Sequence, residues 1–203
     1  MINQSGRFCD KVLDLNTLHG IIVFGLNGSG KTTLGRELAR VLNYKFLDIE
    51  AYHFEKSDIP YSMSRSREEC VELMLADIEK NLSFVIASCD GNLGDTIPKF
   101  YELAVYISVP YDLRMERIKQ RSYLQHGERV LEGGDMYEQD QEFFNFVKER
   151  SIAPIEEWAK TLSCPVVNVD GTKDWRTNAL EIAKIYESKA NSRSGSERMI
   201  KNG

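Results

Sequence analysis

Short apolar runs alternate along the chain with longer segments in which apolar residues recur every three or four positions. Short runs bounded by polar or glycine residues are typical of strands buried on both faces, and the longer period is typical of helices. Alternation of the two predicts a parallel sheet with right-handed crossovers and helices on both faces. The strands are expected over 20–24, 44–49, 84–88, 103–109 and 165–169.

The segments between these runs predict helices. In the first of them Leu34 and Leu38 fall on one face, and Asn43 is a typical residue for the end of a helix. Residues 51–63 show no clear period and predict a loop, whereas 125–134 contains three glycines and predicts a hinged flap. The helices are expected over 31–42, 64–80, 113–124, 137–150, 152–162 and 177–186.

Residues 25–32 match the phosphate-binding pattern G-x-x-x-x-G-K-[ST] between a predicted strand and a predicted helix. Glycines let the backbone N–H groups converge on phosphate oxygens, and the positive end of the following helix faces the anion. Lys31 adds a charge for the β- and γ-phosphates, and the Thr32 hydroxyl can ligate Mg²⁺. We therefore predict a three-layer α/β/α P-loop NTPase fold, with a five-stranded parallel sheet and a short flap insertion. The residues expected to hold ATP here are Gly25, Asn27, Gly28, Ser29, Gly30, Lys31, Thr32 and Thr33.

The length and the net charge of the chain limit the classes of molecule that it is expected to bind. A chain of 203 residues fits one α/β domain, and a net charge of −5 argues against broad nucleic-acid binding. No run is long enough to span a bilayer, and the start of the chain lacks a signal-peptide core, so we expect a cytoplasmic protein without membrane contact. The four cysteines are scattered, as expected of free thiols in a reducing compartment. We divide the chain into an N-terminal extension (1–19), a P-loop domain (20–187) that contains the flap at about 122–136, and a disordered tail (188–203).

Acidic residues follow two of the predicted strands. A period of two places Asp48 and Glu50 on one side at the end of the second strand, where they would either serve a site or only solvate the strand end. In a site, they could coordinate Mg²⁺ or take a proton from an acceptor hydroxyl. Asp90 follows the third strand, at the usual place of a second Mg²⁺ anchor.

Several arginines are candidates for contact with anions. Arg65 falls in the first turn of a predicted helix, where a cation opposes the helix dipole, so it serves either an anion or only solvent. Arg117 and Arg121 share one face of the next basic helix, for which a solvated face is the alternative. Arg150 lies on the line of a buried stripe and therefore needs an anionic partner.

Over residues 20–186 these motifs resemble adenylate kinases and shikimate kinases. The run at 116–121 is similar to the adenylate kinase segment before the flap, which implies that Arg117 lies against adenine and Arg121 reaches phosphate. The run at 169–173 resembles the loop that cups adenine in those enzymes, which implies nucleotide contacts for Gly171, Thr172 and Lys173. The same resemblance implies that Arg129 and Arg150 clamp the transferred phosphoryl group and that Asp90 lies on the Mg²⁺ side.

On the acceptor side the chain resembles shikimate kinases. Residues 46–50 are similar to their Phe-x-Asp-x-Asp motif, which implies a metal role for Asp48 and an acceptor-hydroxyl role for Glu50. Residues 64–68 resemble their Arg-x-Arg-Glu motif, which implies that Arg65 pairs with a substrate carboxylate. Gly91 keeps one of the three glycines after their third strand, and adenylate kinases carry an arginine beyond Gly91 that this chain lacks.

We therefore expect a kinase that uses ATP and Mg²⁺ to phosphorylate a hydroxyl of a small molecule, as a monomer or a homodimer. Lys31, Arg121, Arg129, Arg150 and Glu50 are the expected catalytic residues, with Thr32, Asp48 and Asp90 on the metal and Asp48, Glu50, Arg65 and Gly91 on the acceptor. One alternative is an NTPase or nucleotide-gated module that transfers phosphoryl groups only to water. A kinase of nucleic-acid ends is a second alternative, against which the acidic balance argues.

Overall fold

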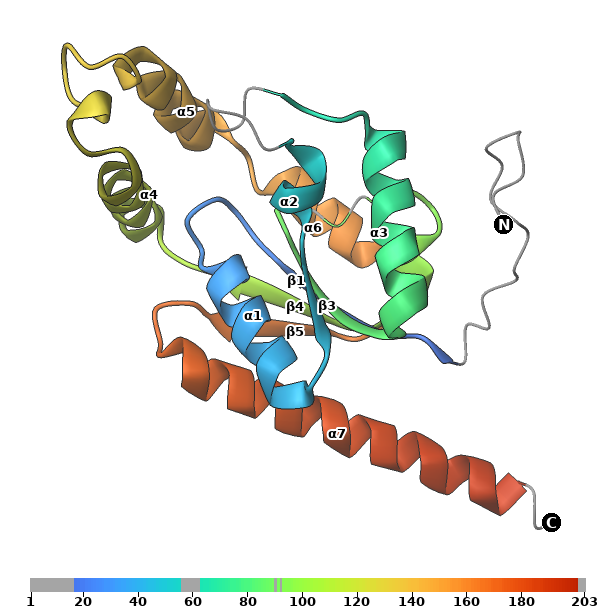
Figure 1. The fold of residues 1–203 in the computed structure, drawn as a ribbon. Coiled ribbons are helices and arrows are strands. Elements are labelled where there is room, and N and C mark those ends of the chain that lie inside the picture. Colours follow the sequence, from blue (N-terminus) through green and yellow to red (C-terminus); the bar gives the residue numbers. More distant parts are fainter. Residues whose placement is uncertain (1–16, 56–62, 90, 92, 201–203) are drawn as a thin grey trace, which may run out of the picture.

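The central feature of the computed structural model is a sheet of five parallel strands in the order β2-β3-β1-β4-β5 (Figure 1). The structure describes residues 17–55, 63–89, 91 and 93–200. β1 lies in the middle, where Ile22 pairs with Ile86 of β3 on one side and with Ala104 of β4 on the other. The strands are β1 (His19–Phe24), β2 (Lys45–Asp48), β3 (Ser83–Ser88), β4 (Tyr101–Ser108) and β5 (Val166–Asp170).

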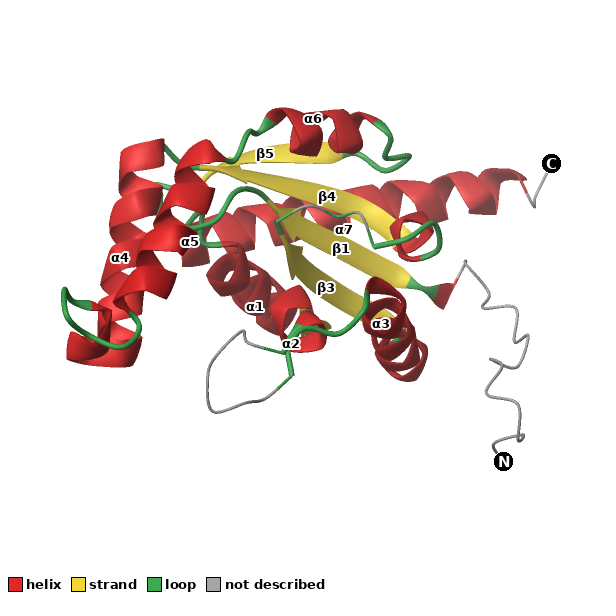
Figure 2. Ribbon diagram, turned by 90° about the horizontal axis from the view of Figure 1, so that it is seen from above, coloured by secondary structure: helices red, strands yellow, loops and turns green. Residues whose placement is uncertain are grey.

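Helices cover both faces of this sheet, as Figures 1 and 2 show. The α-helices are α1 (Lys31–Leu42), α2 (Ile49–His53), α3 (Arg67–Asn81), α4 (Tyr111–His126), α5 (Tyr137–Glu149), α6 (Ala153–Lys160) and α7 (Trp175–Ile200). Two 3₁₀ turns, η2 (Ile97–Phe100) and η3 (Gly127–Val130), precede β4 and follow α4. The predicted three-layer α/β/α fold with a five-stranded parallel sheet is confirmed.

The core consists of two layers, one on each face of the sheet. Successive residues of β1 point to opposite faces, so Ile22 packs with Ile78 of α3 and Ile155 of α6, whereas Ile21 packs with Leu34 of α1 and Ile182 of α7. These side chains are almost completely buried. Burial on both faces explains why the strands appear in the sequence as continuous apolar runs.

The pair α4–α5 projects beyond the carboxyl ends of the strands, away from the sheet (Figures 1 and 2). In an open parallel sheet, ligands bind outside this edge. The loop between β1 and α1 also lies at this edge, because it follows the carboxyl end of β1 and all the strands are parallel. The fold therefore places the phosphate-binding sequence opposite α4 and α5.

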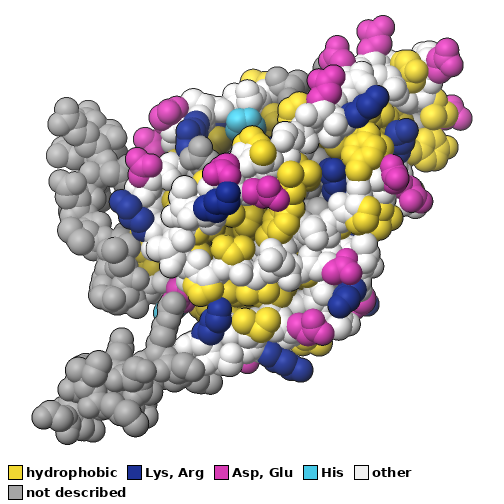
Figure 3. Space-filling model, turned by 180° about the vertical axis from the view of Figure 1, so that it is seen from behind, with side chains coloured by type: hydrophobic (Ala, Val, Ile, Leu, Met, Phe, Trp, Pro, Cys, Tyr) yellow, Lys and Arg dark blue, Asp and Glu magenta, His cyan; other side chains and the backbone are white. Residues whose placement is uncertain are grey.

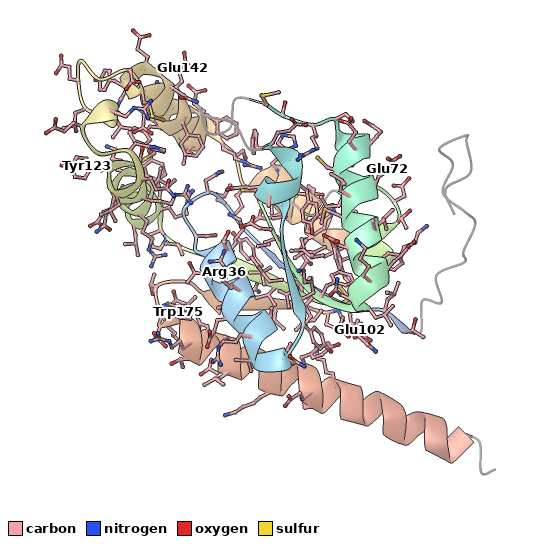
Figure 4. The ribbon with its side chains drawn as sticks, viewed as in Figure 1. Arg36, Glu72, Glu102, Tyr123, Glu142 and Trp175 are labelled. Carbon is pink, nitrogen blue, oxygen red and sulfur yellow. The ribbon has the colours of Figure 1, made fainter. Side chains whose placement is uncertain are left out.

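A polar cluster closes the other end of the sheet. The Tyr186 hydroxyl of α7 donates to the Glu102 carboxylate of β4, and the Tyr44 hydroxyl donates to Tyr186 Oη at 3.1 Å. His19 Nδ1 lies 3.1 Å from the same carboxylate. Figure 4 shows Glu102 at the end of the molecule remote from Tyr123 of α4 and Glu142 of α5.

Element boundaries differ from the expectations in three places. β2 ends at Asp48 and the chain turns directly into α2, so part of the loop expected over 51–63 is helical. α3 begins only at Arg67, because Ser66 caps it in a reciprocal capping box with Glu69. α7 continues to Ile200, over most of the segment expected to be disordered, since no proline interrupts it and a polar composition does not by itself end a helix. None of the helices in the described ranges combines the length and the apolar character needed to cross a membrane.

Candidate functional site

The loop between β1 and α1 has the backbone shape that its glycines predict. Gly28 and Gly30 adopt φ values of +78° and +93°, which side chains of L-residues rarely permit. A Cβ on Gly28 would lie 2.5 Å from the carbonyl oxygen of Arg114, so the loop also needs glycine for its close approach to α4. The α1 helix begins at Lys31 without a side-chain cap, and its first-turn N–H groups therefore stay available for an anion.

Two polar side chains of this region, Lys31 and Ser29, bear on phosphate binding. Lys31 Nζ donates to the carbonyl oxygen of Leu26 at 3.0 Å. The Ser29 hydroxyl is buried and has no hydrogen-bond partner among the described residues. A buried hydroxyl without a partner is costly, and a bound phosphate oxygen is the kind of group that would satisfy it. The loop between β1 and α1 therefore fits a nucleotide phosphate.

Arg114 supports the loop from α4, a role that the sequence analysis missed. Its guanidinium donates to the carbonyl oxygens of Asn27 at 3.1 Å and Val109 at 3.2 Å, and its side chain is almost completely buried. Burial lowers the pKa of Arg114 below its ordinary value. In the sequence it stands beside Asp112 in a basic helix, and nothing there separates it from solvated arginines.

A cavity of about 540 Å³ connects this loop with α4, α5 and the ends of β2 and β3. Its volume falls within the range of roughly 300–1,000 Å³ typical of small-molecule sites. It is lined by Asn27, Lys31, Thr32, Asp48, Ile49, Glu50, His53, Phe54, Ala87, Ser88, Cys89, Ile118, Arg121, Ser122, Gln125, His126, Met136, Gln139, Asp140, Phe143, Phe146 and Arg150. Seven of the predicted site residues thus line one space: Asn27, Lys31, Thr32, Asp48, Glu50, Arg121 and Arg150.

The two acidic residues after β2 reach this cavity by a different route from the one expected. We predicted that Asp48 and Glu50 share one side because residues alternate in a strand. That reason was wrong, because Glu50 belongs to α2 and not to β2. Asp48 is the N-cap of α2, and its carboxylate accepts the backbone N–H of Glu50 at 3.3 Å. Because β2 ends at the residue that caps α2, both carboxylates, of Asp48 and Glu50, lie in the lining of the cavity.

Arg150 and Arg121 supply positive charge to the lining from two different helices. Arg150 is the C-cap of α5, and its guanidinium donates to Asn27 Oδ1 at 2.9 Å and lies over the Phe146 ring. This partner is a neutral amide oxygen of the phosphate-binding loop, so the anionic partner expected for Arg150 stays a prediction. Arg121 is exposed on α4 at the cavity.

The residues expected around adenine gather at a neighbouring place. Arg117 of α4 donates to the carbonyl oxygen of Gly171 at 3.1 Å, which brings two of them into contact. Thr172 lines a second hollow with Arg114 and Asp170, and its hydroxyl and N–H hold the pKa of Asp170 below its usual value. Lys173 is exposed beside them.

Other predicted site residues are not brought to the cavity lining. Arg65 lies before α3, not in its first turn, and donates to the carbonyl oxygens of Tyr52 and Phe54 at 3.0 and 3.2 Å. Arg129 is exposed and forms a bidentate ion pair with Asp135, with one contact at 2.8 Å. Their expected roles in binding an acid and in clamping phosphate therefore have no support in this geometry.

Gly91 and Asp90 complete the set of predicted residues. A Cβ on Gly91 would lie 2.0 Å from the Trp158 ring, which shows that this glycine serves packing against α6. Trp158 itself packs edge-on against Phe24 of β1. Asp90, predicted as a metal ligand, lies outside the described residues.

The donor set fits a magnesium ion delivered with a nucleotide. Within the described ranges no three His, Cys, Asp or Glu side chains are close enough to hold a metal by themselves. Mg²⁺ bound with substrate phosphates needs only one or two protein ligands. The Thr32 hydroxyl and the Asp48 carboxylate, which line the same cavity, are oxygen donors of the right kind.

Comparisons with known proteins assign this architecture to a family. The model of the AAA domain family matches residues 21–144, more than half of the chain. Shikimate kinase of Clostridium botulinum is 30% identical over 118 residues, which cover 52% of this chain and 68% of the relative. The uncharacterized protein YqaC of Bacillus subtilis is 29% identical over 158 residues, or 74% and 87% of the two chains.

Solved structures share the fold. A protein of Chloroflexus aurantiacus assigned as a kinase superposes with a TM-score of 0.54 at 22% identity, over 83% of this chain and 98% of that one. Shikimate kinase from Acinetobacter baumannii in complex with shikimate gives a TM-score of 0.50 at 20% identity, over 85% and 95%. Because the sequence match to a kinase and the family model agree with the phosphate-binding geometry, the chain belongs to the AAA domain family and to the small P-loop kinases, which are phosphotransferases.

Proposed function

We propose that this protein transfers the γ-phosphoryl group of ATP to a hydroxyl of a small acceptor, with Mg²⁺ as the metal. The observation that carries the proposal is a single cavity shared by the phosphate-binding loop, Arg121, Arg150 and the two carboxylates of Asp48 and Glu50. In a phosphoryl transfer the protein mainly positions the reactants and stabilises charge. The cavity supplies groups for both tasks.

The loop and its neighbours act on the donor. The backbone N–H groups at the start of α1 and Lys31 bind β- and γ-phosphoryl oxygens, which moves Lys31 Nζ away from the Leu26 carbonyl. Arg150, already bonded to Asn27, and Arg121 stabilise charge on the transferred group. Gly171, Thr172 and Arg117 contact the base of the nucleotide, and Lys173 borders it.

Thr32 and Asp48 would hold the metal, with Asp90 as a further ligand. When bound, Mg²⁺ neutralises phosphate charge. Glu50 lines the same cavity, where its carboxylate orients the acceptor hydroxyl and takes its proton. Ile118 and Met136 lie in the lining and exclude water, which suppresses hydrolysis.

Calorimetry and product analysis test this proposal. MgATP should bind the wild type, and Lys31→Ala should abolish measurable binding, whereas the exposed Lys80→Ala should bind as the wild type does. Arg121→Ala should lower kcat by on the order of 10²–10³-fold, the scale of one preorganised donor. No MgATP binding by the folded wild type would refute the proposal. If the rate of phosphate release from ATP were the same with and without every candidate acceptor, the protein would be a hydrolase and not a kinase.

A further inference from the structure

The cavity also carries information on the acceptor, through the distribution of its charges. Resting on the kinase function proposed above, we infer that the acceptor is an uncharged nucleoside, phosphorylated on a sugar hydroxyl. The inference uses three properties of the lining: its lysine and arginine side chains are assigned to the donor phosphates, one wall carries aromatic rings, and two amide side chains are among its polar groups.

The proposed function assigns every lysine and arginine of the described lining to the donor phosphates. These side chains are Lys31, Arg121 and Arg150, and the two histidines His53 and His126 line the cavity as well. Lys31 belongs to the phosphate-binding loop, and Arg150 is bonded to it through Asn27. A buried carboxylate or phosphate on the acceptor would need a cation of its own, because an unpaired charge is costly to bury.

The arginine expected to bind an acceptor carboxylate is engaged elsewhere. Arg65 donates to two backbone carbonyl oxygens at the end of α2 and lies 3.6 Å from the Glu55 carboxylate. It does not line the cavity. Asp140, in contrast, does line it and accepts the Ser122 hydroxyl at 2.7 Å. The acceptor end therefore disfavours an anion.

Aromatic and apolar side chains form one wall of the cavity. Phe143 and Phe146 of α5 stack with ring centroids 6.4 Å apart and an angle of 23° between their planes. Phe54 and Met136 line the same space. Phe146 keeps 52% of its surface exposed, so its ring is accessible from the cavity. Seen from behind, hydrophobic side chains gather over the α4–α5 end of the molecule, among charged ones (Figure 3).

Amide side chains stand beside this wall. Gln125 of α4 and Gln139 of α5 line the cavity and are exposed on its side. An amide both donates and accepts hydrogen bonds, which matches the alternating donors and acceptors on the edge of a nucleobase. A flat apolar face, a hydrogen-bonding edge and no lysine or arginine beyond those assigned to the donor together fit a nucleoside better than a sugar acid.

The reaction balances with groups already in the cavity. The sugar hydroxyl oxygen forms a bond to the γ-phosphorus as the bond from that phosphorus to the β,γ-bridging oxygen breaks. The bonding pair leaves with the nucleoside diphosphate, and the hydroxyl proton passes to the Glu50 carboxylate. The products are a nucleoside monophosphate and ADP.

The test measures phosphoryl transfer from γ-³²P-labelled ATP by the full chain to three acceptor groups in parallel. These are nucleosides, hydroxy acids including shikimate and gluconate, and nucleoside monophosphates. MgATP binding is measured on the same sample, so that failure of the kinase proposal is recognised separately. We expect label to appear only on one or more nucleosides.

Three outcomes overturn the inference. Transfer to a hydroxy acid or to a monophosphate in preference to every nucleoside would refute it and leave the kinase proposal standing. MgATP binding without transfer to any nucleoside would refute it as well. Absence of MgATP binding would refute both proposals together.

Matched variants test the aromatic wall. Phe143→Ala should raise the KM for the nucleoside on the order of 10-fold to 100-fold, the scale of one base–aromatic contact, with the dissociation constant of MgATP unchanged. Phe144→Ala is the control, since Phe144 lies on the same helix, packs under Lys119 and does not line the cavity. Equal KM values for Phe143→Ala and the wild type would contradict the placement of the base.

A gain of charge tests the neutrality of the acceptor. Gln139→Lys puts a cation on the exposed side of the lining. It should lower kcat/KM for the nucleoside and raise it for a nucleoside monophosphate, with MgATP binding retained. An unchanged ratio of the two kcat/KM values would show that charge at this end does not select the acceptor.

Discussion

The close approach of the phosphate-binding loop to α4 gives a prediction that can be worked out from distances. Gly28→Ala places a Cβ 2.5 Å from the carbonyl oxygen of Arg114 and 3.0 Å from Ile118 Cδ1. Its φ of +78° adds a left-handed strain of about 1 kcal/mol for any residue with a Cβ. Relief of the contact requires movement of backbone, and overpacking of this kind costs a further ~1–3 kcal/mol. The free energy of unfolding should therefore fall by about 2–4 kcal/mol in total.

Gly133→Ala provides the matched control. Gly133 has a φ of +86°, but a Cβ there meets no atom within 4 Å, so this variant carries only the strain of about 1 kcal/mol. Urea unfolding measures both variants, and calorimetry measures MgATP binding. We expect Gly28→Ala to lose more stability than Gly133→Ala and to bind MgATP more weakly, because the loop shifts. Equal unfolding midpoints, with MgATP bound as tightly by Gly28→Ala as by the wild type, would refute this reasoning.

Three further predictions concern other parts of the chain. Gly91→Ala should destabilise the fold by ~1–3 kcal/mol in urea unfolding, since its Cβ would overlap the Trp158 ring; a neutral effect would contradict that packing. The Tyr52 hydroxyl donates to Asp77 at 2.8 Å and holds the pKa of that carboxyl below its usual value, so this contribution exists above pH 4 to 5 and is lost as the pH falls through the lowered pKa. Tyr52→Phe should therefore cost about 1 kcal/mol at pH 7 and progressively less below about pH 4, and a loss independent of pH would argue against the bond. Arg129→Ala should leave kcat within about a factor of ten in steady-state assays, because its guanidinium is paired outside the lining; a larger loss would show that the flap closes over the phosphoryl group.

The sequence predicts well those features that depend on short-range patterns. The helix over 31–42 has the predicted bounds, and Asn43 ends it in the left-handed conformation that asparagine tolerates. The order of strands and helices predicts the parallel sheet, because a buried strand and an amphipathic helix each have a recognisable period. The phosphate-binding pattern likewise fixes its own backbone shape.

Features that depend on long-range contacts could not be predicted in this way. Arg114 stabilises the loop across 87 positions of sequence, and its environment is visible only in the folded chain. Arg65 resembles a substrate-binding arginine, yet backbone carbonyl groups of α2 take up its donors. Glu50 reaches the predicted place through a helix cap, an alternative to strand continuation that the apolar run over 44–49 does not reveal.

The way α4 and α5 are attached to the rest of the molecule has a consequence for exchange of amide hydrogens with solvent. Both helices lie wholly in the described ranges, and their fully buried side chains are only Arg114, Ile118 and Val147. β1 and β3, in contrast, are buried along almost their entire length. Few buried contacts imply a small free energy of local opening. The backbone amides of α4 and α5 should therefore exchange through local opening of these two helices, which requires little free energy. The amides of β1 and β3 should exchange only when the whole chain unfolds.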